Sequence, residues 1–248
     1  MDQPILELRD ISCYLEKGTN IFSRICFVVN EGDILVLQGR SGSGKSTLLK
    51  CIAHLALHDG NSLYRGSTPQ EYGIPAYRTR VMYIPQRPSL LPGSPHDFLE
   101  SITNLRAHKA FFRDNSGEGP VKEVFKRAVE VGEAWGIQPE LWHRTWMNLS
   151  GGEGQRMLLA AAVSLNTAEI FLLDEPTSAL DSETSSLVEN FLVDRVRTAD
   201  TNLKAMIWIT HSPEQSRRVG SRFIHLSAGG CYETEDPSPS PHPTTPVG

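Results

Sequence analysis

Hydrophobic residues in this chain form two kinds of pattern, short continuous runs and longer segments with helical spacing. The run at 34–37 lies between turn residues and a glycine-rich segment, which is typical of a buried parallel strand. Directly after the glycines, apolar residues recur with helical spacing. The strands predicted in this way are 5–8, 25–29, 33–38, 170–173 and 205–210, and the helices are 48–56, 121–135, 150–163 and a segment through Leu187 and Leu192. Because strands and helices follow one another along the chain, the sequence predicts an α/β core.

The composition is that of a globular protein without a disulfide or membrane framework. The 248 residues carry 24 Lys and Arg against 29 Asp and Glu, a net charge of −5, so no nucleic acid partner is expected. The cysteines at 13, 26, 51 and 231 are scattered, which excludes a zinc ribbon and fits a reducing compartment. No apolar run approaches the roughly 18 residues of a membrane helix, and the N-terminus does not read as a secretory signal. We expect a soluble, cytoplasmic protein.

Residues 39–46, GRSGSGKS, match the phosphate-binding pattern GxxxxGK[ST] between a predicted strand and a predicted helix. Glycines let successive backbone N–H groups curl round a phosphate, and the positive end of the following helix faces the same anion. Lys45 supplies a charge for the β- and γ-phosphates, and the Ser46 hydroxyl is a candidate Mg²⁺ ligand. The flanking strand and helix disfavour the alternative of a merely flexible loop. The predicted nucleotide-binding residues here are Gly39, Arg40, Ser41, Gly42, Ser43, Gly44, Lys45, Ser46 and Thr47.

Two carboxylates follow the predicted buried strand 170–173. A charge at the end of an apolar strand is costly unless it lies at the solvent edge beside a cation, so Asp174 is predicted to meet Mg²⁺ through water. Glu175 points elsewhere and suits a general base that polarises the attacking water. An Asp-Glu helix cap is the common structural alternative, but the phosphate loop in the same chain disfavours it.

The segment LSGGEGQR predicts a second anion-binding helix N-terminus. It combines a cap hydroxyl, glycines and bare backbone N–H groups. Taken alone the pattern is a weak signal, since caps of this type are common; beside the two motifs above it becomes informative. The residues predicted to bind here are Ser150, Gly151 and Gly152.

These motifs and their order resemble the nucleotide-binding subunit of an ATP-binding cassette (ABC) transporter: phosphate loop, the glutamine of YIPQRP, LSGG, LLDEPTSALD and the histidine of WITH. The resemblance implies ATP and Mg²⁺ as cofactors. It implies that Gln86 contacts Mg²⁺ or water, that His211 holds the γ-phosphate, and that Asp181 communicates across a dimer. It also implies a head-to-tail homodimer in the ATP-bound state, with the LSGG of one chain completing the site of the other. Glu153 stands where the family more often has glutamine, from which we expect a mild change.

The predicted catalytic set is complete, so the resemblance implies an active ATPase. The implied fold is a P-loop NTPase core with a RecA-like parallel sheet, an antiparallel β subdomain and a helical subdomain at about 87–150. The cassette is expected to cover 1–232, followed by a disordered tail rich in Pro, Ser and Thr at 233–248. The family also has an aromatic residue that stacks on adenine, for which Tyr14 is the candidate and Leu15 the alternative alignment. The predicted catalytic residues are Glu175, His211, Lys45 and Gln86.

A separate integral membrane transporter subunit is the expected partner, contacted through the segment from Gln86 to about Leu105. That stretch, QRPSLLPGSPHDFLESI, resembles export-type cassettes, and the whole chain most resembles the small stand-alone subunits of iron exporters and their metal-tolerance relatives. The expected location is peripheral, on the cytosolic face of a membrane. The alternative is a soluble ABC ATPase that drives assembly, such as iron–sulfur cluster biogenesis.

Overall fold

A mixed six-stranded sheet forms the centre of the molecule. The computed structural model describes residues 3–14, 18–87, 92–112, 119–198, 201–227 and 230–235. The strand order is β5-β6-β7-β3-β8-β9, parallel except for β9, which is antiparallel to β8. The strands are β3 (Ile34–Gln38), β5 (Val81–Ile84), β6 (Ile170–Asp174), β7 (Ala205–Ile209), β8 (Arg222–Ser227) and β9 (Gly230–Thr234). Every residue of β6 and β7 is buried; β6 confirms the buried strand predicted at 170–173, and β7 is the strand predicted at 205–210.

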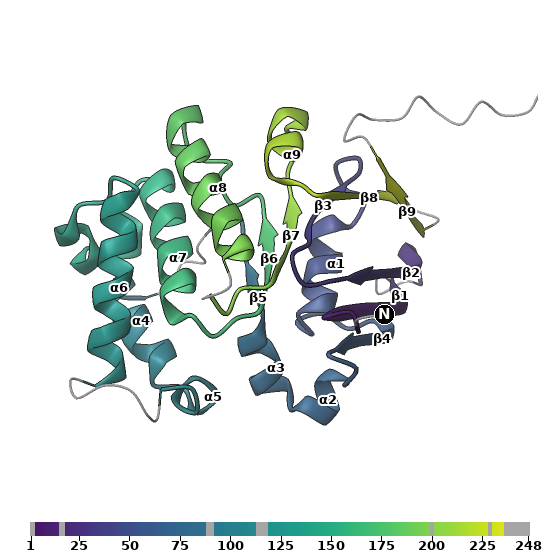
Figure 1. Ribbon diagram of the computed structural model, residues 1–248, viewed down its shortest axis with the longest axis horizontal. Coiled ribbons are helices and arrows are strands. Elements are labelled where there is room, and N and C mark those ends of the chain that lie inside the picture. Colours follow the sequence, from purple (N-terminus) through teal and green to yellow (C-terminus); the bar gives the residue numbers. More distant parts are fainter. Residues whose placement is uncertain are drawn as a thin grey trace, which may run out of the picture.

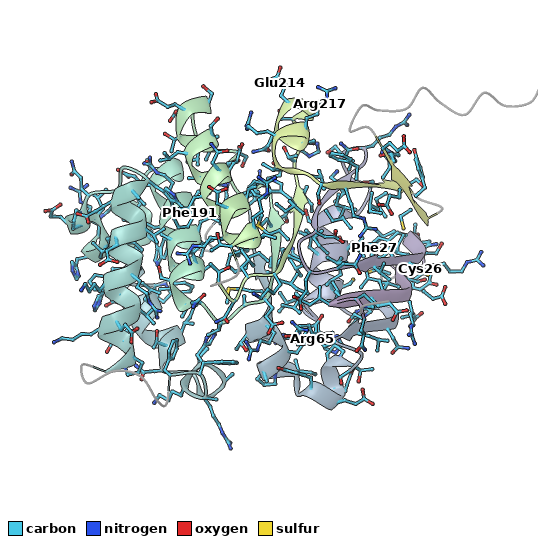
Figure 2. All side chains as sticks on the ribbon, in the orientation of Figure 1. Cys26, Phe27, Arg65, Phe191, Glu214 and Arg217 are labelled. Carbon is cyan, nitrogen blue, oxygen red and sulfur yellow. The ribbon has the colours of Figure 1, made fainter. Side chains whose placement is uncertain are left out.

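A second, antiparallel sheet lies beside the first, in the order β2-β1-β4 (Figure 1). Its strands are β1 (Leu6–Tyr14), β2 (Asn20–Val29) and β4 (Asp59–Tyr64). The strand predicted at 5–8 overlaps β1 from Leu6 on, and the strand predicted at 25–29 falls within β2, whereas β4 was not predicted. Arg65, labelled in Figure 2, follows β4 and connects this sheet to the central one. Its guanidinium lies 2.7 Å from the carboxylates of both Glu31 and Glu169.

The helices lie on the two faces of the central sheet and at its ends (Figure 1). They are α1 (Lys45–Ile52), α2 (Pro69–Tyr72), α3 (Ile74–Arg80), α4 (Pro95–Thr103), α5 (Arg106–Lys109), α6 (Pro120–Ala134), α7 (Gly151–Leu165), α8 (Ser182–Arg197) and α9 (Pro213–Val219), with 3₁₀ turns η1 (Pro139–His143) and η2 (Trp146–Asn148). The helix predicted at 121–135 is α6, which buries Val124, Ala128 and Val131 on one face. Among the described helices, none is long and apolar enough to cross a membrane.

Alternating side chains of the central sheet enter two separate hydrophobic cores. Strand β6 sends Ile170 and Leu172 into a core that contains α1 and the antiparallel sheet. Its Phe171 and Leu173 enter the other core, with α6, α7 and α8. This alternation is the strand periodicity of two, here with both faces covered. The central sheet is therefore held on both sides, and the carboxyl end of β6 is a fixed platform for the polar residues that follow it.

The helical part of the chain packs as one unit on one side of the sheet. Helix α6 packs against both α4 and α7, and Trp135, directly after α6, meets Phe191 of α8 with ring centroids 5.2 Å apart (Figure 2). Helices α4, α5 and α6 and the turns η1 and η2 fall within the predicted helical segment 87–150, but α7, which packs with them, begins just after it.

The boundary expected at residue 232 falls inside β9, which runs to Thr234. Glu233, expected in the tail, pairs with Arg222 of β8 through two hydrogen bonds of 2.7 and 2.9 Å. These bonds hold the pKa of the Glu233 carboxyl below its usual value. The remaining tail residues, from 236 on, lie outside the described part of the chain.

Truncation distinguishes the strand from the tail. A chain ending at Cys231 lacks the last residues of β9 and the Glu233–Arg222 pair, so we expect its free energy of unfolding to fall by about 1–2 kcal/mol. A chain ending at Glu235 is the control and should match the full-length protein. The measurement is urea denaturation followed by fluorescence. Equal stability of the two truncated chains would contradict this account of β9.

Candidate nucleotide site

The loop between β3 and α1 has the backbone geometry of a phosphate cradle. Gly44 caps α1 in the left-handed region at φ 91°, and a Cβ there would lie 2.7 Å from Ile21 Cγ2. Gly39 has φ 147°, and its Cβ would lie 2.5 Å from the Leu226 carbonyl oxygen. Only glycine fits either position. The loop therefore exposes backbone N–H groups at the N-terminus of α1, where a helix attracts anions.

Lys45 lies inside this loop with 6% of its surface exposed. Its Nζ donates to the Gly39 and Arg40 carbonyl oxygens at 2.9 and 3.0 Å. Burial lowers the pKa of Lys45, while the carboxylates of Glu175 and Asp174 act in the opposite direction. A cation beside a row of backbone donors, with carboxylates nearby, is an arrangement that binds phosphate and a metal together.

An open cavity of about 560 Å³ adjoins the loop, a size typical of small-molecule sites. Among the described residues, the Ser43 Oγ at its wall is buried and has no hydrogen-bond partner, which leaves it available to a ligand. His225 lines the same cavity, a position that the sequence did not indicate. Burial lowers the pKa of His225, and the positive charges of Lys45 and Arg40 lower it further. The lining residues are Asn20, Ile21, Arg40, Ser41, Gly42, Ser43, His225, Leu226 and Ser227.

Two of the three predicted metal-binding residues, Ser46 and Asp174, meet directly, whereas the third, Gln86, contacts Glu175. The Ser46 Oγ donates to Asp174 Oδ1 at 2.9 Å, and Tyr83 of β5 donates its hydroxyl to Asp174 Oδ2 at 2.9 Å. Asp174 is 6% exposed. Burial raises the pKa of Tyr83, and the negative charge of Asp174 adds to the shift. Oxygen ligands of this kind suit Mg²⁺. The sequence did not indicate Tyr83 as a site residue. The four residues of β5 do not show which side chain will contact the end of β6.

Glu175 occupies a sharp corner directly after β6. Its φ is 47°, in the left-handed region, and its N–H donates to the Ile209 carbonyl of β7 at 3.1 Å. The carboxylate is held on both oxygens. Gln86 Nε2 donates to Oε2 at 2.8 Å, and His211 Nε2 lies 3.1 Å from Oε1. The structure thus brings the four predicted catalytic positions to one end of the sheet, with Gln86 contacting Glu175.

The second predicted anion site is a capped helix N-terminus. Ser150 caps α7, accepting from the Glu153 N–H at 3.2 Å, while the Glu153 carboxylate accepts from the Ser150 N–H at 2.7 Å. This reciprocal pair is a capping box. The hydrogen bond from the Ser150 backbone, with a smaller contribution from the Ser150 hydroxyl, lowers the pKa of Glu153. Ser150 and Gly151 are exposed, and a Cβ on Gly152 would lie 3.2 Å from the Ala179 carbonyl oxygen.

Three other positions complete the comparison with the sequence predictions. Asp181 caps α8 by accepting from the Thr184 N–H at 2.9 Å. Thr47 lies in the first turn of α1. Tyr14 is 49% exposed at the end of β1, paired with Asn20, and is not among the described residues that line the cavity. Its alternative, Leu15, lies outside the described residues.

Gln155 of α7 is a further residue that the sequence did not single out. It is 2% exposed, and its amide bonds to the backbone of the segments that carry Gln86, Glu175 and Asp181. The partners of this amide are all distant in the sequence, so its role could not be predicted from the residues around it. Helical periodicity shows only that the position faces inward.

Comparison with known families agrees with this geometry. The ABC transporter family model matches residues 22–178, which include the phosphate loop, the capped N-terminus of α7 and both carboxylates after β6. The phosphate import ATP-binding protein PstB of Methylobacillus flagellatus is 30% identical over 234 residues, covering 93% of this chain and 88% of that protein. The molybdate/tungstate import ATP-binding protein WtpC of Pyrococcus horikoshii is 35% identical over 220 residues, covering 86% of this chain and 57% of that protein.

The fold is also that of a solved cassette. A dimeric ATP-binding cassette in a post-hydrolysis state, bound to ADP and Pi, superposes with a TM-score of 0.77 at 24% identity, covering 95% of this chain and all of that one. This likeness confirms the predicted fold class, an α/β cassette with a largely parallel sheet and a separate antiparallel sheet.

Lys45→Ala tests the phosphate loop. The variant loses the charge beside the cradle and the two hydrogen bonds to the loop carbonyls, so we expect ATP affinity to fall roughly 10-fold or more. Isothermal calorimetry with ATP measures it. Lys50→Ala, which removes an exposed lysine from the last turn of the same helix, is the matched control. Equal affinity in the Lys45→Ala and native proteins would remove Lys45 from the phosphate site.

Proposed function

The chain belongs to the ABC transporter family, and from that premise we propose that two copies hydrolyse ATP between them to energise a separate membrane subunit. It is an ATPase of the ABC type that uses ATP with Mg²⁺. The observation that carries the proposal is the Glu175 carboxylate, held between Gln86 and His211 at the end of the strand that also presents Asp174.

Glu175 acts as the general base in this proposal. With Gln86 on one carboxylate oxygen and His211 on the other, the side chain is oriented before the substrate arrives. Such a group lowers the barrier by accepting a proton from the attacking water, an effect typically worth about 10²–10⁴-fold in rate. The left-handed backbone at Glu175 costs energy and is kept because β7 holds its N–H.

The phosphate loop supplies binding and charge. Lys45 and the backbone donors of the loop hold the β- and γ-phosphates, and Ser46 and Asp174 hold Mg²⁺. The metal, when bound, neutralises negative charge on the phosphate oxygens. The unpartnered Ser43 hydroxyl at the cavity wall is a further group that can orient the phosphate. His211, which lies beside Glu175, contacts the γ-phosphate in this proposal.

The exposed N-terminus of α7 supports a head-to-tail dimer. One chain carries two helix ends built for anions, and a single triphosphate between two chains uses one end from each. Ser150, Gly151 and Gly152 then contact the nucleotide bound to the other copy. Asp181 is exposed at the start of α8, just after Ala179 and Leu180, which lie against Gly152; it faces the same dimer contact in this proposal. Tyr14 is proposed to stack on adenine.

Glu175→Gln separates binding from chemistry. The amide keeps the shape of the side chain but cannot accept the proton, so ATP affinity should persist while steady-state hydrolysis falls about 10²–10⁴-fold. The variant should also accumulate as a dimer in ATP, seen as an earlier peak in gel filtration. Glu130→Gln, an exposed carboxylate on α6, is the control. Monomer alone in ATP would contradict the shared site, and undiminished turnover would exclude Glu175 as the base.

We propose that the membrane subunit docks on the side of the molecule that carries α3 and α5, where Leu57 and Leu105 are exposed. Leu57, 96% exposed, lies in the loop after α1, and the neighbouring His54 carbonyl accepts from Arg78 of α3 at 2.5 Å. Helix α3 in turn contacts α5, which follows directly on Leu105, 55% exposed (Figure 1). This surface offers apolar area whose burial by a partner is favourable. It includes the far end of the predicted segment 86–105, in which residues 88–91 lie outside the described part.

Affinity capture from native membranes tests this partner. The native chain should retain a multi-span membrane protein, and Leu57→Asp or Leu105→Asp should lose most of it while ATP hydrolysis by the isolated chain stays unchanged. Leu187→Asp, a partly exposed leucine on α8, is the control. Retention of a soluble scaffold protein, with no membrane protein, would favour the alternative of an assembly ATPase such as one for iron–sulfur clusters.

The cargo is set by the membrane subunit in this proposal, and the chain is placed peripherally on the cytosolic face. The prediction of metal-ion export rests on the resemblance of residues 86–102 to export-type cassettes and stays a prediction. The relatives described above are named for import of phosphate and of molybdate or tungstate, which does not support it. The identity of the captured membrane protein decides between export and import.

A further inference from the structure

Gln155 links three backbone segments that surround the catalytic carboxylate. Its Nε2 donates to the Gln86 carbonyl at 2.9 Å and to the Glu175 carbonyl at 3.0 Å. Its Oε1 accepts from the Ala179 N–H at 3.0 Å. The side chain is 2% exposed, so water does not compete for these bonds. Both amide donor positions and one acceptor position are therefore used, each on a different segment.

The contacted atoms control the direction of the Glu175 side chain. The Glu175 N–H is fixed on Ile209, and its carbonyl is fixed on Gln155. These two bonds hold both peptide groups of a residue that already has an unfavourable left-handed backbone. The bond to the Gln86 carbonyl holds the backbone of the residue whose amide contacts the Glu175 carboxylate. A shift of Gln155 therefore moves the base and the group that orients it together.

Gln155 is also rigidly attached to the helical part of the molecule. Helix α7 packs along α6, and the next residue, Arg156, donates to the Trp135 carbonyl at 3.1 Å. The segments it contacts belong to the carboxyl end of the central sheet. One side chain thus connects two parts of the fold, and the contacts it makes are directional hydrogen bonds that a rotation of α7 would break.

We propose that Gln155 is a positioning residue that transmits the placement of the helical segment to Glu175, and so lets nucleotide and partner contacts on α7 set the rate of hydrolysis. The proposal rests on the proposed function of Glu175 as the base. The hydrogen bond from the Ala179 N–H to Gln155 also connects the turn before Asp181 to α7, so this turn should move with the helix. The capped N-terminus at Ser150, one helical turn away, would then influence the base through α7 when it binds a second copy's nucleotide.

Gln155→Met tests the proposal. Met has nearly the same length and volume but no hydrogen-bonding amide. Since the cradle and Lys45 are not altered, ATP affinity should stay within about two-fold of native, while kcat falls roughly 10- to 100-fold. Gln138→Met, an exposed glutamine before η1, is the matched control and should keep native kcat. Thermal unfolding of each variant shows whether it is folded.

Gln155→Glu adds a readout that a purely structural role would not change. The introduced carboxylate keeps the acceptor for Ala179 but faces two carbonyl oxygens and lies near the charge of Glu175, so burial and repulsion raise its pKa. Protonation restores one donor. The ratio of variant kcat to native kcat should therefore rise as the pH is lowered from about 8 to about 6, and this test remains decisive if Gln155→Met does not fold.

The results that overturn the proposal differ from those that overturn the function. Native kcat in a folded Gln155→Met protein, or a flat ratio for Gln155→Glu across that pH range, excludes positioning by Gln155. A loss of ATP affinity equal to the loss of kcat in either variant assigns Gln155 to general integrity of the site and also excludes it. If the native chain and the Gln138→Met control hydrolyse no ATP, the proposed function fails instead.

Discussion

A buried carboxylate at the end of a buried strand is the constraint on which this site depends. Asp174 has lost most of its contact with water, and its two oxygens are satisfied by hydroxyls from Ser46 and Tyr83. These hydroxyls lie on α1 and β5. The two hydrogen bonds to the Asp174 carboxylate therefore hold α1, and the phosphate loop before it, close to the ends of β5 and β6. Lys45 belongs to the same set of buried charges, since the nearby carboxylates partly offset the lowering of its pKa by burial. Stability and chemistry use the same groups here.

The corner after β6 fixes the direction of Glu175, the proposed general base. Glu175 keeps its unfavourable left-handed backbone because β7 accepts from its N–H and Gln155 of α7 donates to its carbonyl. These hydrogen bonds offset the energy of the strained conformation. Gln86 and His211 then determine where the Glu175 carboxylate points. The geometry of the proposed catalytic residues therefore depends on the packing of α7 against the sheet, and so on elements that are well separated in the chain.

Local chemistry made part of this structure predictable from the sequence. The phosphate loop, the buried strands β6 and β7 and the cap at Ser150 each follow from a short stretch of residues. Tyr83 and Gln155 could not be predicted, because each is defined by partners that only the tertiary fold brings near. Strand β4, sequence DGNSLY, has too few apolar residues to show a period of two, and β9 is a strand because its backbone pairs antiparallel with β8.

The position of Gly39 carries a consequence for how sequence variation in this loop is interpreted. A methyl group there would overlap the main-chain oxygen of Leu226, at the end of β8, before it met any nucleotide. The first glycine of the phosphate-binding pattern is thus required by a steric contact with the neighbouring strand β8. Impaired nucleotide binding after substitution at this glycine would therefore reflect displacement of the β8–β9 hairpin as much as loss of a backbone contact to the phosphate.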